Sequence, residues 1–411
     1  MSVAWQKVTF DEAPLAIIDG DRGKNYPKQD EFSDTGHCLF LNTGNVTKSG
    51  FEFSHCQFIT EQKDGLLRKG KLSREDVIMT TRGTIGNAAY FNGNVPYDNI
   101  RINSGMVIFR TDDEKLLPSF LYQYIRSEQF NRQVNALRSG AAQPQLPIRD
   151  IKVIELPLPP IDQQESISSL LEKYDDLIEN NKRRIELLEE SARQLYKEWF
   201  VRFRFPGHEH VPIVDGVPEG WSNGCVSDLG DVITGKTPST KVKENFGGDI
   251  PFVKTPDMHA SSIIIEPEEY LSERGANTQS NKFLPKFSIL VACIGARLGV
   301  VSLNARRCQT NQQINGVVPR SENYTFYAYL TLKGFREKLL AIGGGATMPN
   351  VNKSKFSGME VLLPPESLLE SFHDMVTQPF FQMEKLIEMN QKLVEARELL
   401  LPKLMSGDIA V

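Results

Sequence analysis

Three short stretches contain residues of the types and spacing that chemistry could use. Gly230 to Thr237, GDVITGKT, matches the pattern G-x-x-x-x-G-K-[ST], in which backbone N–H groups and a lysine hold the phosphates of ATP or GTP. The pairs His37-Cys38 and His55-Cys56 could together supply zinc ligands. Glu61-x-Lys63 is a fragment of the kind found in nucleases. These stretches would indicate a nucleotide-binding protein, a metalloprotein and a nuclease, respectively.

The sequence around each stretch argues against that chemistry. Val232 and Ile233 stiffen the first stretch, and Pro238, which follows it, contributes no N–H. The His-Cys pairs lack compact ligand spacing, so strand residues in a core are the alternative. No proline-aspartate partner precedes Glu61, and a tetrapeptide like N-P-P-Y, typical of adenine methyltransferases, is missing. We therefore expect no catalytic residue, no metal site and no cofactor in this chain.

Composition places the chain among soluble globular proteins. Its 411 residues suffice for two or three domains, with 40% hydrophobic and 24% charged residues. No apolar run approaches a membrane span, and the start lacks the features of a secretory signal. Five cysteines without a C-x-x-C favour free thiols in a reducing compartment. We expect a cytoplasmic protein without membrane contact. The net charge of −5 excludes a uniformly basic nucleic-acid coat but permits a local DNA-binding patch.

The sequence repeats itself once. GAAQP at 140–144 and GATMP at 345–349 are each followed, sixteen residues later, by a proline of LPLPP or VLLPP. HCLFLNT at 37–43 aligns with DIPFVKT at 249–255, and VIMTTRGTIG at 77–86 aligns with ILVACIGARLG at 289–299 if one residue is inserted. The order is therefore a globular region, a helical region, and both again. We set the boundaries at 1–160, 161–206, 207–365 and 366–411.

The globular regions combine α and β elements. VIMTT, GMVIF, SILVACI and GVVSL are short strand-like runs separated by Gly, Asn and Pro. One helix is expected in each region, over 120–134 and over 325–342. The expected fold class is mixed α/β, with two similar domains.

The helical regions have the apolar spacing of a coiled-coil seam. Apolar residues recur mostly three and four positions apart over about forty residues, with one asparagine in each row. Pro379 is expected to interrupt or kink the second helix. We expect the two helices to pair antiparallel and to separate the two domains, which gives an approximate two-fold axis; two helices packed separately on their own domains are the alternative. The seam is assigned to Leu177, Asn181, Leu188, Leu195, Met383, Leu386, Asn390, Leu393 and Leu400.

Several of these segments resemble the specificity subunit of type I restriction-modification systems. The resembling segments are LPLPPIDQQESISSLLEKYDDLIENN with the helix that follows, PEGW before LGDVITGKTP, and LLPPESLLESF with the tail LLLPKLMSGDI. The resemblance implies two target-recognition domains that each read one half of a split sequence in double-stranded DNA. It also implies helices that bind two modification subunits, which use S-adenosylmethionine to methylate adenine. A restriction subunit, which uses ATP, can join the complex.

Residue types suited to DNA contact cluster near the matching strands. Arg, Lys, Asn and Gln read base edges, whereas Lys, Arg, Ser and Thr bind phosphates. With the offset of HCLFLNT and DIPFVKT, Gly235-Lys236 aligns with Gly23-Lys24, so a Gly-Lys turn shared by both domains is predicted. Solvated polar loops are the alternative for each residue, and a scaffold with two protein-binding heads is the alternative for the whole chain. The predicted DNA-binding residues are Lys24, Thr81, Arg82, Thr84, Asn99, Arg101, Lys236, Lys254, Arg297, Arg306, Arg307, Gln309, Asn311 and Gln312.

Overall fold

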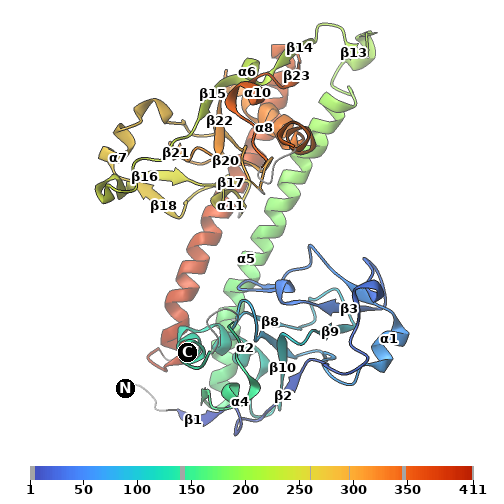
Figure 1. Ribbon diagram of the computed structural model, residues 1–411, viewed down its shortest axis with the longest axis vertical. Coiled ribbons are helices and arrows are strands. Elements are labelled where there is room, and N and C mark those ends of the chain that lie inside the picture. The colour runs from blue at the N-terminus through green and yellow to red at the C-terminus, as the bar shows by residue number, and fades with distance from the viewer. Residues whose placement is uncertain (1–4, 139–143, 260, 296, 345–348, 410–411) are drawn as a thin grey trace. The chain divides into compact units, whose positions relative to one another are not determined.

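A computed structural model describes residues 5–138, 144–259, 261–295, 297–344 and 349–409 (Figure 1). The chain divides into two compact units. The first comprises Met1–Leu177 and Leu393–Val411, and the second comprises Ile178–Lys392. Each unit contains one globular domain with the adjoining sections of both long helices. The unit boundaries therefore fall inside the helices, whereas our four-part division followed the helix ends.

An antiparallel sheet forms the middle layer of the first domain. Its order is β2-β10-β7-β8, with bounds Leu15–Asp19, Met106–Thr111, Val77–Thr80 and Ala88–Tyr90. Side chains alternate between its faces: Val77 and Phe109 join one apolar cluster, whereas Ile78 and Ile108 join another. Because both faces are covered, these strands contain uninterrupted apolar runs, such as MVIF in β10 and VIM in β7.

A smaller sheet covers one face of this middle layer. It has the order β6-β3-β9, with bounds Phe58–Ile59, Cys38–Leu41 and Ile100–Ile102, and β3 runs parallel to β9. The short helix α1, Glu61–Leu66, lies in the segment between β6 and β7. β4 (Val46–Thr47) pairs with β5 (Gly50–Phe51).

Helices cover the other face of the middle layer. α2, Pro118–Arg126, and α3, Glu128–Leu137, contribute Phe120, Tyr124 and Phe130 to this core. We predicted one helix here, and this was wrong. Ser127 adopts an extended conformation and its hydroxyl accepts a hydrogen bond from the Phe130 N–H, so it caps a second helix. α4 (Ile148–Ile151) follows, and β1 (Gln6–Thr9) pairs with β11 (Glu155–Leu158).

The second domain repeats this topology. Its middle layer is β15-β22-β19-β20-β17, with bounds Gly230–Thr234, Ile314–Pro319, Ile289–Ala292, Val301–Asn304 and Ile263–Ile264. Its smaller sheet is β18-β16-β21, with bounds Glu269–Leu271, Phe246–Val253 and Gln309–Thr310. β16 and β21 are parallel, as β3 and β9 are in the first domain. The repeat predicted from sequence is thus present in the strand order, and β17 is an addition.

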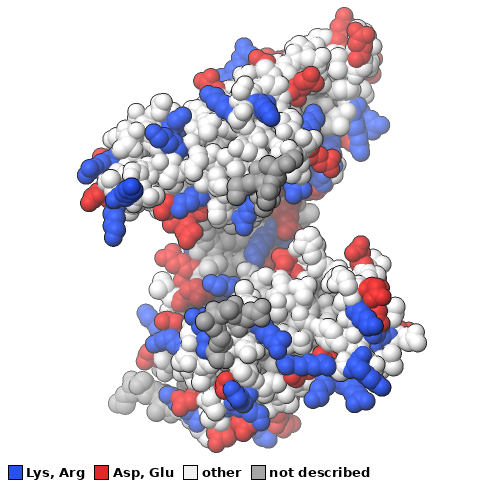
Figure 2. All heavy atoms as spheres, in the orientation of Figure 1, with Lys and Arg blue, Asp and Glu red and all other residues white. Residues whose placement is uncertain are grey.

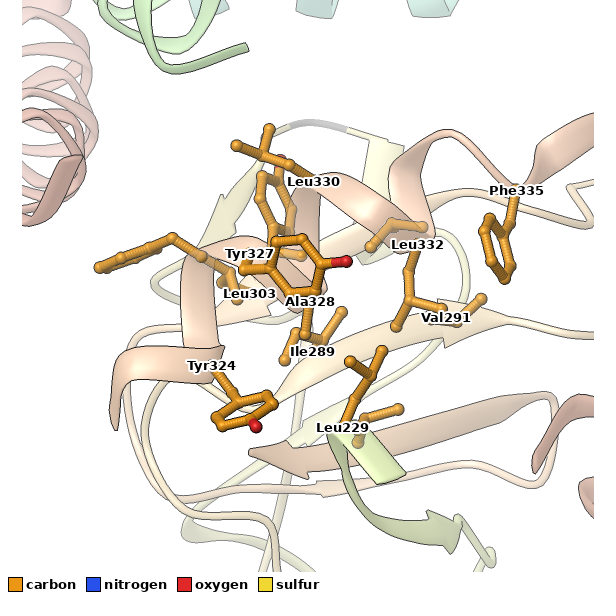
Figure 3. Close-up of a cluster of buried hydrophobic side chains, with 14 of the residues drawn as sticks. Leu229, Ile289, Val291, Leu303, Tyr324, Tyr327, Ala328, Leu330, Leu332 and Phe335 are labelled. Atoms are coloured by element: carbon orange, nitrogen blue, oxygen red, sulfur yellow. The ribbon is translucent and has the colours of Figure 1, made fainter. Parts of the chain in front are cut away.

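Helices again complete the core of the second domain. α8 (Thr325–Lys333) packs against Ile289, Val291 and Leu303 of the middle sheet (Figure 3). A break at Gly334-Phe335 separates α8 from α9 (Arg336–Gly343), so the single helix predicted over 325–342 is also two helices. The remaining elements are α6 (Val226–Leu229), α7 (Glu273–Asn277), α10 (Lys353–Ser357) and the pair β14 (Ser222–Cys225) with β23 (Glu360–Leu363); β12 (Ile213–Val214) pairs with β13 (Val217–Pro218) before them.

The two long helices are α5, Ile161–Tyr196, which ends in a π-helical turn at Lys197–Val201, and α11, Glu366–Met405. α11 continues through Pro379, so the predicted interruption does not occur. Within the second unit, Asn181 Nδ2 donates to Asn390 Oδ1 at 2.9 Å, and Trp199 lies 5.8 Å from Phe372 between ring centroids. Partner numbers fall along α11 as they rise along α5, which makes the pairing antiparallel.

Most predicted seam residues are buried or pack against cores to which both long helices contribute. Met383 is fully buried, Leu386 is buried, and Leu188 and Leu195 pack against the second unit's core. Leu400 packs against the first unit's core, and Leu393 is half-buried.

Leu177 is a wrong assignment, because its side chain is 45% exposed whereas Ile178 is 7% exposed. Two adjacent apolar residues fit the spacing equally well, and the helix turns the second one inward. The same choice occurs one heptad earlier, where Leu171 is buried and Leu170 only partly.

Candidate nucleic-acid interface

One set of backbone hydrogen bonds joins the strand-end loops in both domains. In the first domain, the Asn103 N–H donates to Leu41 O at 3.0 Å, and the Asn103 side chain accepts from the Gly105 N–H at 2.9 Å. In the second domain, the Asn311 N–H donates to Val253 O at 3.1 Å, and the Asn311 side chain accepts from the Gln313 N–H at 3.2 Å. An asparagine therefore closes the same turn after β9 and after β21.

Two further bonds extend this framework to the central sheet. The Thr81 N–H donates to Gly105 O, and the Cys293 N–H donates to Gln313 O, both at 2.8 Å. Thr81 O accepts a hydrogen bond from the Leu146 N–H, and Cys293 O accepts one from the Val351 N–H, both at 2.9 Å. Leu146 and Val351 follow the two Gly/Ala-rich segments. The loops after the smaller sheet and after the central sheet thus meet at one edge of each domain. We call this the shared loop framework, and most of the Gly/Ala-rich segments beside it, 139–143 and 345–348, lie outside the described residues.

A glycine completes the framework and corrects one alignment. A Cβ on Gly20 would lie 2.3 Å from Asn103 O, and a Cβ on Gly235 would lie 2.1 Å from Asn311 O, so a side chain fits at neither position. Gly235 is therefore equivalent to Gly20 and not to Gly23. The connection to the next matching strand is longer in the first domain, which an ungapped offset cannot accommodate. The shared Gly-Lys turn predicted at Lys24 and Lys236 is wrong.

GDVITGKT is not a phosphate-binding loop. Gly230–Thr234 forms β15, and every residue of it pairs with β22. A phosphate loop needs free N–H groups leading into a helix. Here a strand is followed by a turn in which the Lys236 N–H donates to Thr310 O at 2.9 Å.

Two predicted residues of the first domain have exposed side chains beside its shared loop framework. Arg82 forms a backbone bridge to Gln145, and Thr84 lies in the same loop after β7. Lys24 is also exposed, four residues beyond Gly20. Asn99 lies elsewhere, because it precedes β9 whereas Asn103 follows it. The structure thus brings together Arg82 and Thr84 but not Asn99.

In the second domain, three predicted residues project from the framework loops. Lys236, Arg297 and Gln312 are exposed, after β15, β19 and β21 respectively. Lys254 follows β16 but pairs with Glu269 at 2.7 Å. Asn311 is buried, and it closes the turn instead of facing solvent.

Arg101 and Gln309 are corrections, because both are structural residues. Arg101 is 6% exposed; its Nε donates to Asp64 Oδ1 at 2.5 Å, and its other nitrogens donate to the carbonyls of Asp64, Leu67 and Lys69. It therefore anchors the end of α1. Gln309 occupies the equivalent position and is fully buried; its Nε2 donates to Ala276 O at 3.0 Å and so anchors α7. Neither side chain can reach DNA.

Thr81, Arg306 and Arg307 also differ from the prediction. Thr81 is buried and contributes its backbone to the framework. Arg306 and Arg307 precede β21, at the other end of this strand from Gln312. Arg306 pairs with Glu266 at 2.7 Å, and the Arg307 guanidinium lies 3.5 Å from the centroid of the Phe283 ring. The structure separates them from the framework loops.

Cys38 and Cys308 are buried free thiols. Burial raises the pKa of the Cys38 thiol to about 12, and burial raises that of Cys308 likewise to about 12. Within the described ranges, no group of three or more His, Cys, Asp or Glu side chains could hold a metal ion. His37 Nε2 lies 3.7 Å from Oδ2 of the buried Asp64 carboxylate.

The sequence did not single out Gln145, Asn350 or Asn42 as strong candidates. Gln145 bridges Arg82, Asn350 bridges Ile294, and Asn42 follows β3, so all three exposed amides border the framework. Their signal was the repeat itself, because Gln145 and Asn350 stand at equal places after the two Gly/Ala-rich segments.

Charge is mixed over the surface. Lys and Arg are interspersed with Asp and Glu on the face in Figure 2, in keeping with the net charge of −5. Any contact with phosphates must therefore be local. Among the described helices, none has a stretch both long and apolar enough for a membrane span.

Comparison with known proteins gave consistent matches. A family model described as the type I restriction modification DNA specificity domain matches residues 5–190 and 218–367, one match in each repeat. The chain is 31% identical to the type I restriction enzyme HindI specificity subunit of Haemophilus influenzae, over 95% of this chain and 98% of that protein.

A second relative and a solved structure agree with this match. The chain is 27% identical to the MjaIX specificity subunit of Methanocaldococcus jannaschii, over 82% and 78% of the two chains. The crystal structure of a type I restriction-modification S subunit from M. genitalium has a similar fold, with a TM-score of 0.59 at 15% identity, covering 97% and 96%.

Proposed function

Because the chain belongs to the family of type I restriction-modification specificity subunits, we propose that each of its domains reads one half of a split DNA sequence. The observation that carries this proposal is the shared loop framework. The same backbone bonds recur in both domains, whereas the side chains differ: the exposed Arg82 stands where the second domain has the half-buried Ile294. Two copies of one framework with different side chains suit a ligand with two different half-sites.

DNA binding by this chain is local. Lys24, Arg82, Lys236 and Arg297 are exposed in loops that follow strands of the two central sheets. Cations at such positions bind phosphates, and neighbouring amides read base edges. The mixed surface charge and the net charge of −5 keep the chain from coating DNA without regard to sequence.

The chain itself catalyses nothing and carries no cofactor, and the partner subunits bind S-adenosylmethionine and ATP. The long helices dock two modification subunits, which methylate adenine, and a restriction subunit can join them. Antiparallel helices in a chain with an internal repeat offer two similar surfaces to two copies of one partner.

The test is to produce the chain with its modification subunit and to map methylated adenines in DNA exposed to the complex. Methylation at one split sequence is the expected result, and the chain alone should transfer no methyl group. Binding should weaken steeply with salt, because phosphate contacts release counterions. A protein-binding scaffold would show no sequence-specific methylation and no salt-dependent DNA binding, and either absence would refute the proposal.

A further inference from the structure

We infer that Gln312 is a base-reading side chain of the second domain and that Gly235-Lys236-Thr237 is the turn that positions it, an inference that rests on the proposed function. Gln312 projects from the shared loop framework between two fixed neighbours. Asn311 on one side is bonded to Val253, and Gln313 on the other accepts from the Cys293 N–H. Because the backbone is hydrogen-bonded on both sides of Gln312, the position of its Cα is fixed.

The side chain of Gln312 is held as well. The Thr237 hydroxyl donates a hydrogen bond to Gln312 Oε1 at 2.7 Å. Thr237 is the last residue of GDVITGKT, so the threonine that resembled a phosphate-loop residue contacts a glutamine instead. A flexible side chain restrained in this way loses less conformational entropy when it binds.

The turn that contains Thr237 is fixed by three other bonds. The Gly235 N–H donates to Ile314 O at 3.0 Å, and the Lys236 N–H donates to Thr310 O at 2.9 Å. The buried Gln279 side chain donates to Lys236 O at 2.5 Å. Only glycine fits at 235, as shown above, because the chain passes directly beneath Asn311 O. The backbone N–H and carbonyl of Lys236 are thus both hydrogen-bonded, and its exposed side chain can contact a phosphate next to the base.

The chemistry of Gln312 selects the base. Among the described residues, the hydrogen bond from Thr237 uses one lone pair of Oε1, and the Nε2 group and the second lone pair can contact a ligand. A glutamine amide with a donor and an acceptor matches N7 and N6 of adenine in the major groove. We therefore expect Gln312 to require an A·T pair at one position of the second half-site.

The first domain has a serine at the place equivalent to Gln312. Ser104 stands between Asn103 and Gly105, in the place that Gln312 holds between Asn311 and Gln313. Arg22 donates to the Ser104 carbonyl at 3.3 Å, so this turn is held through the backbone and not through a long amide side chain. The requirement read by Gln312 should therefore belong to one half-site alone.

The experiment uses the complete complex with its modification subunit and a pool of DNA sites varied one position at a time. Gln312→Ala should reduce discrimination at one position of one half-site by about 5- to 150-fold, and leave the other half-site unchanged. Gln312→Glu should change the preferred base at that same position. Asn223→Ala, an exposed amide on β14, is the matched control and should change nothing.

Thr237 is tested as a positioning residue by two variants. Thr237→Val removes the hydroxyl and should relax the same position as Gln312→Ala but to a smaller degree, whereas Thr237→Ser keeps the hydroxyl and should restore selectivity. Thermal unfolding of each variant complex shows whether the fold is kept.

Three outcomes would overturn the inference or its basis. If Gln312→Ala and Gln312→Glu leave every position unchanged in an otherwise selective complex, Gln312 reads no base. If Gln312→Ala lowers methylation equally at all sites, its contact is to phosphate. If the wild-type complex itself has no sequence preference, the proposed function fails. This outcome differs from failure of the inference about Gln312, in which the wild-type complex is selective and the Gln312 variants match it.

Discussion

Replacing Arg101 should unfold part of the first domain and should not act as the loss of a DNA contact. The side chains of Arg101 and Asp64 are 7% and 6% exposed, and four hydrogen bonds link Arg101 to Asp64 and the end of α1. Arg101→Ala therefore removes one donor from a buried carboxylate and one donor from each of three carbonyl oxygens.

The size of the effect follows from this geometry. Removing one partner of a buried ion pair costs about 3–5 kcal/mol. Lys71 still pairs with Asp64 in the variant, so the lower end, about 3 kcal/mol, is expected. A domain is typically stable by only about 5–15 kcal/mol, so this loss is a large share of the margin.

Hydrogen–deuterium exchange measured by mass spectrometry can resolve the effect by segment. Amides of β7 and β9 that exchange through opening of the first unit should exchange roughly 100-fold faster in Arg101→Ala. Amides of β19, in the second unit, should be unchanged and serve as an internal control. Arg82→Ala, at an exposed position, should alter protection by less than about 0.5 kcal/mol.

A specific pair of results would refute this reasoning. If Arg101→Ala retains wild-type protection in β9 while the complex loses DNA affinity, Arg101 is a DNA contact and not an anchor of α1. A weaker version of the same effect is expected from Gln309→Ala, because that anchor is neutral and an orphaned neutral group costs about 1–3 kcal/mol.

Three other predictions concern groups away from the loops. Burial acts to raise the pKa of Asp175, but Arg126, Gln123 and Arg397 outweigh it and lower that pKa. The first unit should therefore lose stability as pH falls below about 4, where the unfolded carboxyl titrates. Denaturant midpoints measured across pH that show no acid-linked loss relative to Asp175→Asn would contradict this. Joint replacement of Asn181 and Asn390 by leucine should raise the midpoint of the second unit, because an apolar pair replaces a seam amide pair, and a lowered midpoint would argue against it. Cys308 should resist iodoacetamide at pH 7.5 until the chain is unfolded, since its pKa is raised to about 12 by burial; native-state labelling detected by mass spectrometry would disprove that.

The repeat and the strands were predictable because they depend on local patterns. VIM at the start of β7 and ILVA of β19 are uninterrupted apolar runs, which indicates strands covered on both faces, and both are central strands. The long helices followed from apolar spacing over about forty residues, a signal that few other structures produce.

The reading residues were only partly predictable, because burial of a polar side chain depends on distant segments. Arg82 and Arg101 look alike in the sequence, yet one is exposed and the other is enclosed by α1, which lies in a different part of the chain. RRCQTNQQIN looks like one polar loop, but Gln309–Thr310 is a buried strand that separates its two ends. The single offset of the repeat also failed near Gly235, where the two connections differ in length.

The core of the first unit is completed by the last part of the chain. Leu401, Leu404 and Met405 of α11 are buried together with Ile167 and Leu171 of α5 and the strands that precede them. During synthesis, more than two hundred further residues must therefore be added after the N-terminal domain before α11 can cover its apolar surface. A nascent chain that stops short of residue 400 should leave this surface open to chaperones, so a truncation at one terminus would damage the domain at the other.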